Sequence, residues 1–200
     1  MSIDEGYVKY DSNWTRAPAV DTRVTTLLDR WRRSLFDAKL IGYDPELEVG
    51  YGNLSIRYGD AGFVISGTQT GHLANTTAEH YCRVTAYDID ANHIRCEGPC
   101  QASSEALTHA ALYGLDPRIN AVVHVHSEAL WSAHRDGLPT TRADVAYGTP
   151  AMAREFERLY RDGGLARERL AVMAGHAQGL VAVGGTLADA AGRILALASA

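Results

Sequence analysis

A run of apolar, mostly β-branched residues that ends in two histidines constrains the fold of this chain most strongly. Residues 121–126 read Ala-Val-Val-His-Val-His. Such a run is typical of a buried strand, and side chains two positions apart on a strand point to the same face. His124 and His126 therefore share a face near a strand end, where they can bind one cation together. The alternative is one hydrogen-bonded core histidine beside one exposed histidine, and the pair by itself leaves both open.

Composition indicates a soluble globular chain. The 200 residues are 46% hydrophobic and 22% charged, which suits one domain with a full core. The net charge of −5 argues against nucleic acid or an anionic membrane as a partner, and no apolar stretch is long enough to span a membrane. We therefore expect a cytoplasmic protein. Three basic residues are expected on a solvated helix face or a subunit contact: Arg30, Arg32 and Arg33.

The cysteines predict no disulfide framework, because there are three of them, an odd number. Cys96 and Cys100 have a spacing that could supply two of the ligands of a metal knuckle. No second Cys or His pair accompanies them at zinc-finger spacing, so we expect reduced thiols.

Helices and hairpin-linked strands alternate along the chain. Residues 1–19 are expected to form an N-terminal arm, and residues 20–200 a single domain. A helix is predicted from its N-cap at Asp21 to about residue 39, and an antiparallel strand pair on either side of the turn at residues 59–60. This mixture predicts an α/β fold, with one sheet of many antiparallel neighbours covered by helices on both faces.

Two further residues can join the strand histidines in a metal site. His176 stands in a glycine-flanked turn between two apolar segments, and Glu105 follows two serines at the start of a predicted helix. Three imidazoles and a carboxylate suit a catalytic zinc ion with an open coordination position. Glu105 also has a structural interpretation, since a carboxylate in the first turn interacts favourably with the helix dipole. We expect His109, one helical turn further on, to be an inward-facing structural histidine.

Several motifs, in this order, resemble the class II aldolase and adducin family, in its fuculose-phosphate aldolase-like form. The His-x-His strand with an upstream Ser-Ser-Glu is the specific signal, and a Gly-Asn-x-Ser turn alone would be weak. The resemblance covers about residues 22–198. It is carried by residues 52–57, the loop at residues 70–71, residues 103–105 with His109 and Tyr113, residues 121–127, and the His176 turn with residues 181–184.

The resemblance implies a three-layer α/β/α sandwich around a largely antiparallel central sheet, in a homotetramer with sites at subunit interfaces. It implies that Zn²⁺, or another divalent transition metal, is held by His124, His126 and His176. It further implies that Glu105 is the catalytic acid and base. The positions that would hold a substrate phosphate are Asn53, Thr70, Gly71, Ser103 and Ser104. Backbone N–H groups at a glycine turn and a helix start, together with hydroxyls, are suited to hold an anion.

The activity implied is that of a zinc-dependent lyase of carbohydrate metabolism. It would cleave or form a carbon–carbon bond in a small hydroxy-ketone or sugar phosphate through a metal-stabilised enediolate, with Glu105 moving the proton. A zinc-dependent sugar-phosphate dehydratase or epimerase of the same fold is an alternative. A non-catalytic, adducin-like interaction domain is another, although the complete histidine set argues against it.

One segment departs from the family pattern. Only residues 137–145 separate the helix after the His-x-His strand from the element that begins at Tyr147. The region that supplies an aldehyde-side tyrosine from a neighbouring subunit is therefore shortened. Tyr147 is the nearest aromatic replacement, and Glu128 is expected to be a helix-start carboxylate. The reaction class is consequently better supported than the substrate.

Overall fold

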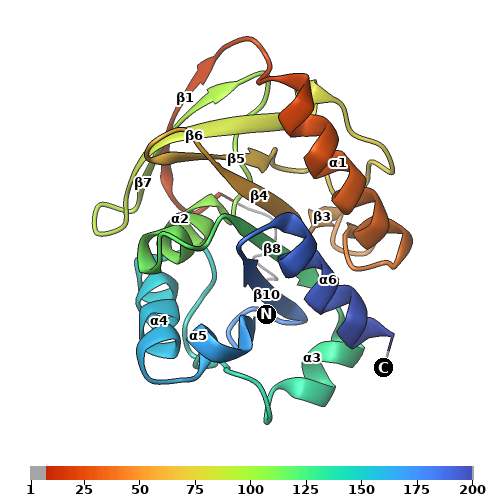
Figure 1. Ribbon diagram of the computed structural model, residues 1–200, viewed down its shortest axis with the longest axis vertical. Helices are drawn as coiled ribbons and strands as arrows, with labels where there is room; N and C mark the ends of the chain where they lie inside the picture. Colours follow the sequence, from red (N-terminus) through yellow and green to blue (C-terminus); the bar gives the residue numbers. More distant parts are fainter. Residues whose placement is uncertain (1–7, 200) are drawn as a thin grey trace.

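The computed structural model describes residues 8–199, which form one main sheet, a small hairpin and surrounding helices (Figure 1). The strands of the main sheet are β1 (Asp11–Arg16), β4 (Asn53–Tyr58), β5 (Gly62–Ser66), β6 (Tyr81–Asp88), β7 (His93–Gly98), β8 (Ala121–His126), β9 (Leu170–Val172) and β10 (Gly179–Gly184). The hairpin consists of β2 (Gly42–Asp44) and β3 (Val49–Tyr51). The helices are α1 (Thr22–Asp37), the 3₁₀ turn η1 (Ala78–His80), α2 (Ala106–Leu115), α3 (Glu128–His134), α4 (Pro150–Arg161), α5 (Leu165–Glu168) and α6 (Leu187–Ala198).

The apolar run at residues 121–126 forms β8, an interior strand. Within the described residues, the main sheet runs β1-β7-β6-β5-β4-β8-β10-β9. β8 is antiparallel to both β4 and β10, whereas β1 and β7 pair in parallel. A strand with neighbours on both edges and helices near both faces needs apolar residues throughout, which explains the run. The α/β class expected from the sequence is confirmed, and the three-layer description stays a prediction.

Two apolar clusters lie on opposite faces of the sheet. Along β5, Phe63 and Ile65 belong to one cluster and Val64 to the other, as the two-residue period of a strand requires. The first cluster contains buried apolar residues of α2 and α4, and the second contains buried apolar residues of α1 and α6. The sheet is thus fixed on both sides, and its strand ends can carry polar groups.

The segment expected to form an N-terminal arm lies partly in the sheet. Residues 11–16 are β1, which pairs with β7, and the indole N–H of Trp14 donates to the carbonyl of Gly98 at 3.1 Å. The arm therefore joins the sheet over this part, while its first seven residues lie outside the described part of the chain. The domain boundary near residue 19 stays a prediction. The β2–β3 hairpin was not expected from the sequence.

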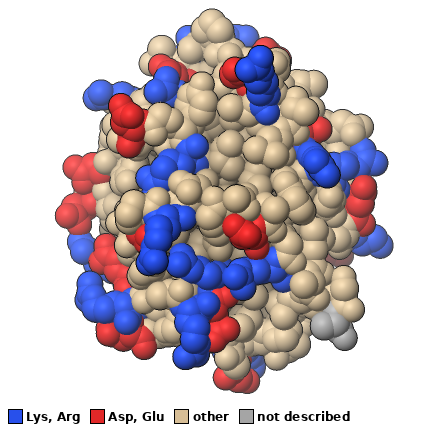
Figure 2. Space-filling model, in the orientation of Figure 1, with Lys and Arg blue, Asp and Glu red and all other residues tan. Residues whose placement is uncertain are grey.

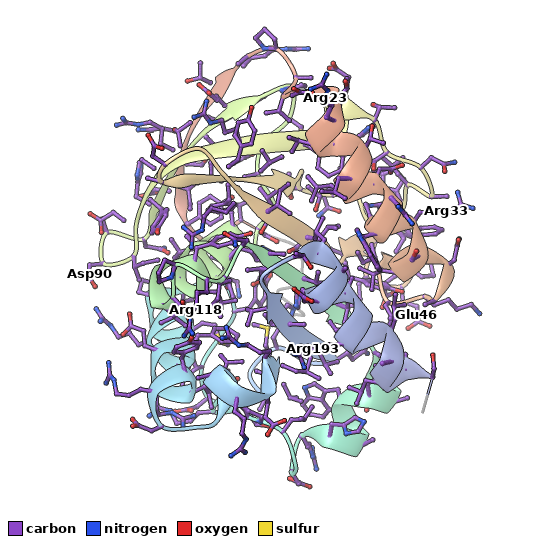
Figure 3. All side chains as sticks on the ribbon, in the orientation of Figure 1. Arg23, Arg33, Glu46, Asp90, Arg118 and Arg193 are labelled. Atoms are coloured by element: carbon purple, nitrogen blue, oxygen red, sulfur yellow. The ribbon has the colours of Figure 1, made fainter. Side chains whose placement is uncertain are left out.

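Charged side chains of both signs are distributed over the face seen in Figure 2. Arg23 and Arg33 on α1, and Asp90 in the β6–β7 turn, project away from the ribbon in Figure 3. Exposed pairs such as Arg33 with Asp37, at 2.9 Å, each contribute little to stability. No helix among residues 8–199 is long and apolar enough to cross a membrane.

Candidate active site

Three histidine side chains converge at one end of β8. His124 and His126 come from that strand, and Gly179 of β10 lies directly opposite His126. The tight turn between β9 and β10 brings His176 to the same place, with its N–H bonded to the carbonyl of Met173. One nitrogen from each of the three rings lies within 4.8 Å of the others.

Gly179 permits this convergence because a side chain there would collide with the histidines. A Cβ atom at Gly179 would lie 3.0 Å from the carbonyl oxygen of His176 and 3.3 Å from Cε1 of His124. Both distances are shorter than nine in ten real Cβ contacts, so a larger residue would make its neighbours move by a few tenths of an ångström.

His124 and His126 have the protonation state that metal ligands require. Burial lowers the pKa of His124 well below its usual range, and the neighbouring imidazoles of His126 and His176 add to this effect. Burial, with His176, lowers the pKa of His126 in the same direction. Both rings are therefore neutral at pH 7 and have a lone pair available for a cation.

The hydrogen bond of His124 fixes which nitrogen carries that lone pair. Its Nδ1 lies 3.1 Å from the carbonyl oxygen of Leu180, which can only accept, so Nδ1 donates. Its Nε2 then faces Nε2 of His126 at 3.0 Å. Two nitrogen ligands of a tetrahedral zinc ion lie about 3.3 Å apart, so the pair fits such an ion after a small adjustment.

Glu105 lies beside the histidine cluster. Its Oε1 is 3.4 Å from Nδ1 of His176, and the residue is only 2% exposed. Glu105 is the N-cap of α2, yet its side chain makes no capping hydrogen bond, and Ser103 Oγ instead accepts from the N–H of Glu105 at 3.3 Å. The carboxylate is thus directed to the site rather than to the end of its own helix, which weakens the structural interpretation.

The five residues expected around a phosphate border the same pocket as Glu105 and the histidines. They come from three places in the fold: Asn53 from the start of β4, Thr70 and Gly71 from the loop after β5, and the two serines from the loop before α2. Asn53 Oδ1 is buried and has no hydrogen-bond partner among the described residues. Among residues 8–199, the pocket is lined by Gly50, Tyr51, Gly52, Asn53, Gly67, Thr68, Gln69, Thr70, Gly71, Ser103, Ser104, Glu105, His124, His126, Tyr147 and His176.

Aromatic rings stack on two of the three histidines. The ring of Tyr147 lies 4.3 Å from that of His176 at an interplanar angle of 21°, and Tyr51 stacks on His126 at 5.4 Å. Nζ of Lys9 lies 3.8 Å from the centre of the Tyr147 ring. The sequence drew attention to Tyr147 but not to Tyr51, although Tyr51 stands between the glycines of the motif at residues 50–52. No sequence signal placed Lys9 here.

His109 lies outside the histidine cluster. Its Nδ1 is 2.7 Å from Oγ of Ser55, which is also 2.7 Å from the hydroxyl of Tyr113. Burial lowers the pKa of His109 to about 3, so it is neutral. These contacts agree with the structural role expected for it. Glu128 is exposed in the first turn of α3 and accepts from Ser132 Oγ at 2.8 Å.

A second cavity, of about 660 Å³, adjoins the pocket. The two share Tyr51 and His126, and the β2–β3 hairpin supplies much of the second cavity's wall. The histidine cluster therefore stands between a small polar pocket and a larger, more apolar space.

Known proteins resemble this chain in fold. L-fuculose-1-phosphate aldolase from Thermus thermophilus superimposes with a TM-score of 0.65 at 21% identity, covering 90% of this chain and 91% of that one. YgbL from Escherichia coli, for which aldolase, epimerase and decarboxylase are named as alternatives, gives 0.64 at 24% identity, with coverage of 89% and 86%. A sugar-phosphate aldolase from Thermotoga maritima gives 0.63 at 14%, with coverage of 86% and 88%. At these identities the likeness shows the fold alone.

Sequence comparison identifies the family. No curated protein matches the chain. The sequence profile of the "Class II Aldolase and Adducin N-terminal domain" matches residues 38–200, which is most of the chain. The chain therefore belongs to the class II aldolase and adducin family.

Proposed function

We propose that this protein is a zinc-dependent lyase that cleaves or forms a carbon–carbon bond in a small, phosphorylated hydroxy-ketone. The observation that carries the proposal is the convergence of three imidazoles and the Glu105 carboxylate on one pocket. A structural cluster of this kind would gather four polar side chains, three of them buried, at high energetic cost, whereas a bound cation compensates for that cost.

The histidine cluster fits a divalent transition metal. Its members would be the ligands, since at least two of the rings are held neutral by burial and one has its lone pair oriented by Leu180. When bound, such a cation would supply the positive charge that stabilises an oxygen anion developing next to the breaking bond. Neutral ligands leave most of that charge available.

Glu105 is proposed as the acid and base. Its carboxylate borders the pocket beside His176, and the surrounding protein excludes water from it. From this position it would accept a proton from the substrate carbon, or return one to it, as the bond forms or breaks. No other Asp or Glu is among the described lining residues, so the proposal assigns this step to one residue.

The phosphate is proposed to bind in the same pocket, among Asn53, Thr70, Gly71 and the two serines. None of the described lining residues is Lys or Arg. Hydroxyls, an amide and backbone N–H groups near the start of α2 would therefore provide the binding energy. The rest of the substrate would extend into the adjoining cavity beside His126. The zinc identity and the homotetramer implied by the family resemblance belong to this proposal, as does the cytoplasmic location expected from the sequence.

Dehydration or epimerisation of a sugar phosphate is the alternative chemistry. It has the support of the likeness to YgbL, for which several activities are named. The same cation and base could serve all of these reactions, because each requires stabilisation of an anion beside a carbonyl group. Product analysis separates them, since only the lyase divides the carbon chain.

The substitution Glu105→Gln tests the proposal. We expect the variant to keep its full zinc content and to lose about 10²- to 10⁴-fold in turnover of a ketose phosphate found by screening, because removing a general base costs about this much. Metal content would be measured by atomic emission and products by mass spectrometry. Glu79→Gln is the control, since Glu79 is exposed on η1 and lines neither cavity. Unchanged turnover of zinc-loaded Glu105→Gln would contradict the assignment of the base.

A further inference from the structure

Two buried side chains donate hydrogen bonds to the backbone of the two loops that are proposed to bind the phosphate. We infer that Arg32 of α1 and Tyr10 are positioning residues, whose hydrogen bonds to backbone carbonyls direct the N–H groups of the two pocket loops toward the substrate anion. The inference rests on the proposed function, because it takes this side of the pocket to bind an anion. Neither residue lies within the part of the chain that matches the family profile, which begins at residue 38.

Arg32 holds the loop at residues 70–73. Its two Nη atoms donate to the carbonyl oxygens of Leu73 at 2.6 Å, Thr70 at 2.7 Å and Gly71 at 3.3 Å. The residue is only 1% exposed, in contrast to the solvated position expected from the sequence. The reason is helical geometry, since position 32 lies on the same face of α1 as the buried Leu28 and Leu35. Arg33 projects outward instead (Figure 3).

A charged side chain is costly to bury, so its partners matter. A guanidinium group without hydrogen bonds in this position would be strongly destabilising. Three backbone carbonyls compensate for part of the cost, and they cannot do so unless the loop keeps its present conformation. Burial also lowers the pKa of Arg32, although the group stays charged at pH 7. The buried charge and the loop conformation therefore stabilise each other.

Tyr10 performs the same task on the other loop. Its side chain is 5% exposed, and its hydroxyl lies 2.9 Å from the carbonyl oxygen of Ser103 and 3.2 Å from that of Ala102, to which it donates. The N–H of Ala106 also donates to the carbonyl of Ser103. The orientation of the peptide group between the two serines is thus fixed by the arm and by α2 together.

The geometry of the peptide group links these hydrogen bonds to the direction of the neighbouring N–H groups. In a trans peptide group the C=O of one residue and the N–H of the next point in opposite directions. With Arg32 holding the carbonyl of Thr70, the N–H of Gly71 points away from Arg32. With Tyr10 holding the carbonyl of Ser103, the N–H of Ser104 points away from Tyr10. Gly71 and Ser104 both line the pocket, so these two N–H groups are the proposed donors to the anion.

The test measures binding of inorganic phosphate by calorimetry to the zinc-loaded protein and to its Tyr10→Phe and Arg32→Lys variants. Tyr10→Phe removes one hydroxyl and keeps the ring, so we expect phosphate affinity to fall about threefold to tenfold, the value of one hydrogen bond. Arg32→Lys keeps the charge and loses the fork of donors, so a fall of at least about tenfold is expected. Zinc affinity, measured by competition with a chelator, should change by less than about twofold in both variants. The reason is that neither side chain bonds to a histidine of the cluster.

Arg57→Lys is the matched control. Arg57 is a half-buried guanidinium that, like Arg32, donates to backbone carbonyls, here those of Ile119 and Tyr113. These carbonyls lie at the other end of α2, away from the pocket, so phosphate affinity should not change. If Arg32 and Tyr10 had only a structural role, all three variants would have lower melting temperatures. Phosphate affinity would then be no weaker in Tyr10→Phe and Arg32→Lys than in Arg57→Lys. Wild-type phosphate affinity in both Tyr10→Phe and Arg32→Lys would overturn the inference.

Amide hydrogen exchange separates this inference from the proposed function. We expect Tyr10→Phe to accelerate exchange in residues 102–105 only, and Arg32→Lys in residues 70–73 only. If the wild-type protein binds no phosphate, the phosphate assignment fails, and exchange then decides whether the two side chains hold the loops. If both variants exchanged at wild-type rates in these loops, the inference that Tyr10 and Arg32 hold the loops would be wrong in that case as well.

Discussion

His124 shows how one residue combines a local and a tertiary condition. Its position on β8 sets the face on which it lies, and the sheet around it removes water from the ring. The carbonyl of Leu180 then selects the tautomer whose Nε2 faces His126. His126 and His176 complete the proposed cation site, which has no acidic ligand. The metal-binding capacity therefore depends on each of the three rings.

Metal binding should stabilise the folded protein measurably. Zinc at about 100 times its dissociation constant should raise the free energy of unfolding by about 2.7 kcal/mol, and a chelator should remove this gain. His176→Asn should lose most of it, because two ligands hold zinc far less tightly than three. The measurement is chemical denaturation with and without zinc. His134→Asn, on α3 outside the cluster, should keep the gain. An equal gain in His176→Asn would contradict the proposed ligand set.

At the scale of elements, the pocket is made by loops that approach each other closely. The loop after β5 meets the β2–β3 hairpin with almost no space between the two backbones. A Cβ atom on Gly71 would lie 2.2 Å from the carbonyl oxygen of Gly42 and 2.7 Å from the nitrogen of Tyr51. Both are backbone atoms, which cannot move aside alone as the end of a flexible side chain can. The loop and the hairpin therefore keep their positions only while residue 71 is glycine.

Gly71→Ala should consequently disturb the pocket more than its size suggests. We expect the free energy of unfolding to fall by about 1–3 kcal/mol, as for other overpacked sites, and phosphate binding to weaken by more than about tenfold. Denaturation and calorimetry measure the two effects. Gly137→Ala is the control, since an added Cβ there meets nothing within 4 Å, and it should be neutral or slightly stabilising. Phosphate affinity equal in Gly71→Ala and the wild type would show that the contact does not shape the pocket.

At the scale of the whole molecule, three histidines with lowered pKa values lie on α2 and β8. Burial lowers the pKa of His109 to about 3, and those of His124 and His126 also lie well below the ordinary value of 6.5. In the unfolded chain the same residues take up protons near pH 6.5, whereas the folded protein does not. Their contribution to stability is therefore complete above pH 6.5 and is lost progressively as the pH falls below it.

This linkage predicts acid-sensitive stability of the metal-free protein. His109→Gln removes one such group, so the loss of unfolding free energy between pH 7.5 and pH 5 should shrink by about 2 kcal/mol. Urea denaturation at the two pH values, with a chelator present, measures this difference, and His93→Gln on β7 is the control. A pH dependence in His109→Gln as steep as in the wild type would mean that His109 titrates normally in the folded state.

The sequence predicted those parts of the site that depend on local pattern. The two-residue period of a strand places His124 and His126 on one face, and the motif before α2 places Glu105 at a helix start. Burial of β8 follows from its composition, and the helix α1 begins after its expected N-cap at Asp21. These features are fixed by residues close together in the chain, so periodicity and capping signals report them directly.

Features that join distant segments were decided only by the tertiary structure. Helical periodicity places Arg32 on the buried face of α1, but the sequence does not say that the loop at residues 70–73 lies against that face. Likewise, β1 joins the sheet and brings Tyr10 to Ser103, across more than ninety positions of sequence. Local backbone geometry determines which way a side chain points, whereas long-range strand pairing and helix packing determine what it meets. The shared face of the two strand histidines could therefore be predicted from the sequence. The contacts of Arg32 and Tyr10 with the pocket loops could not.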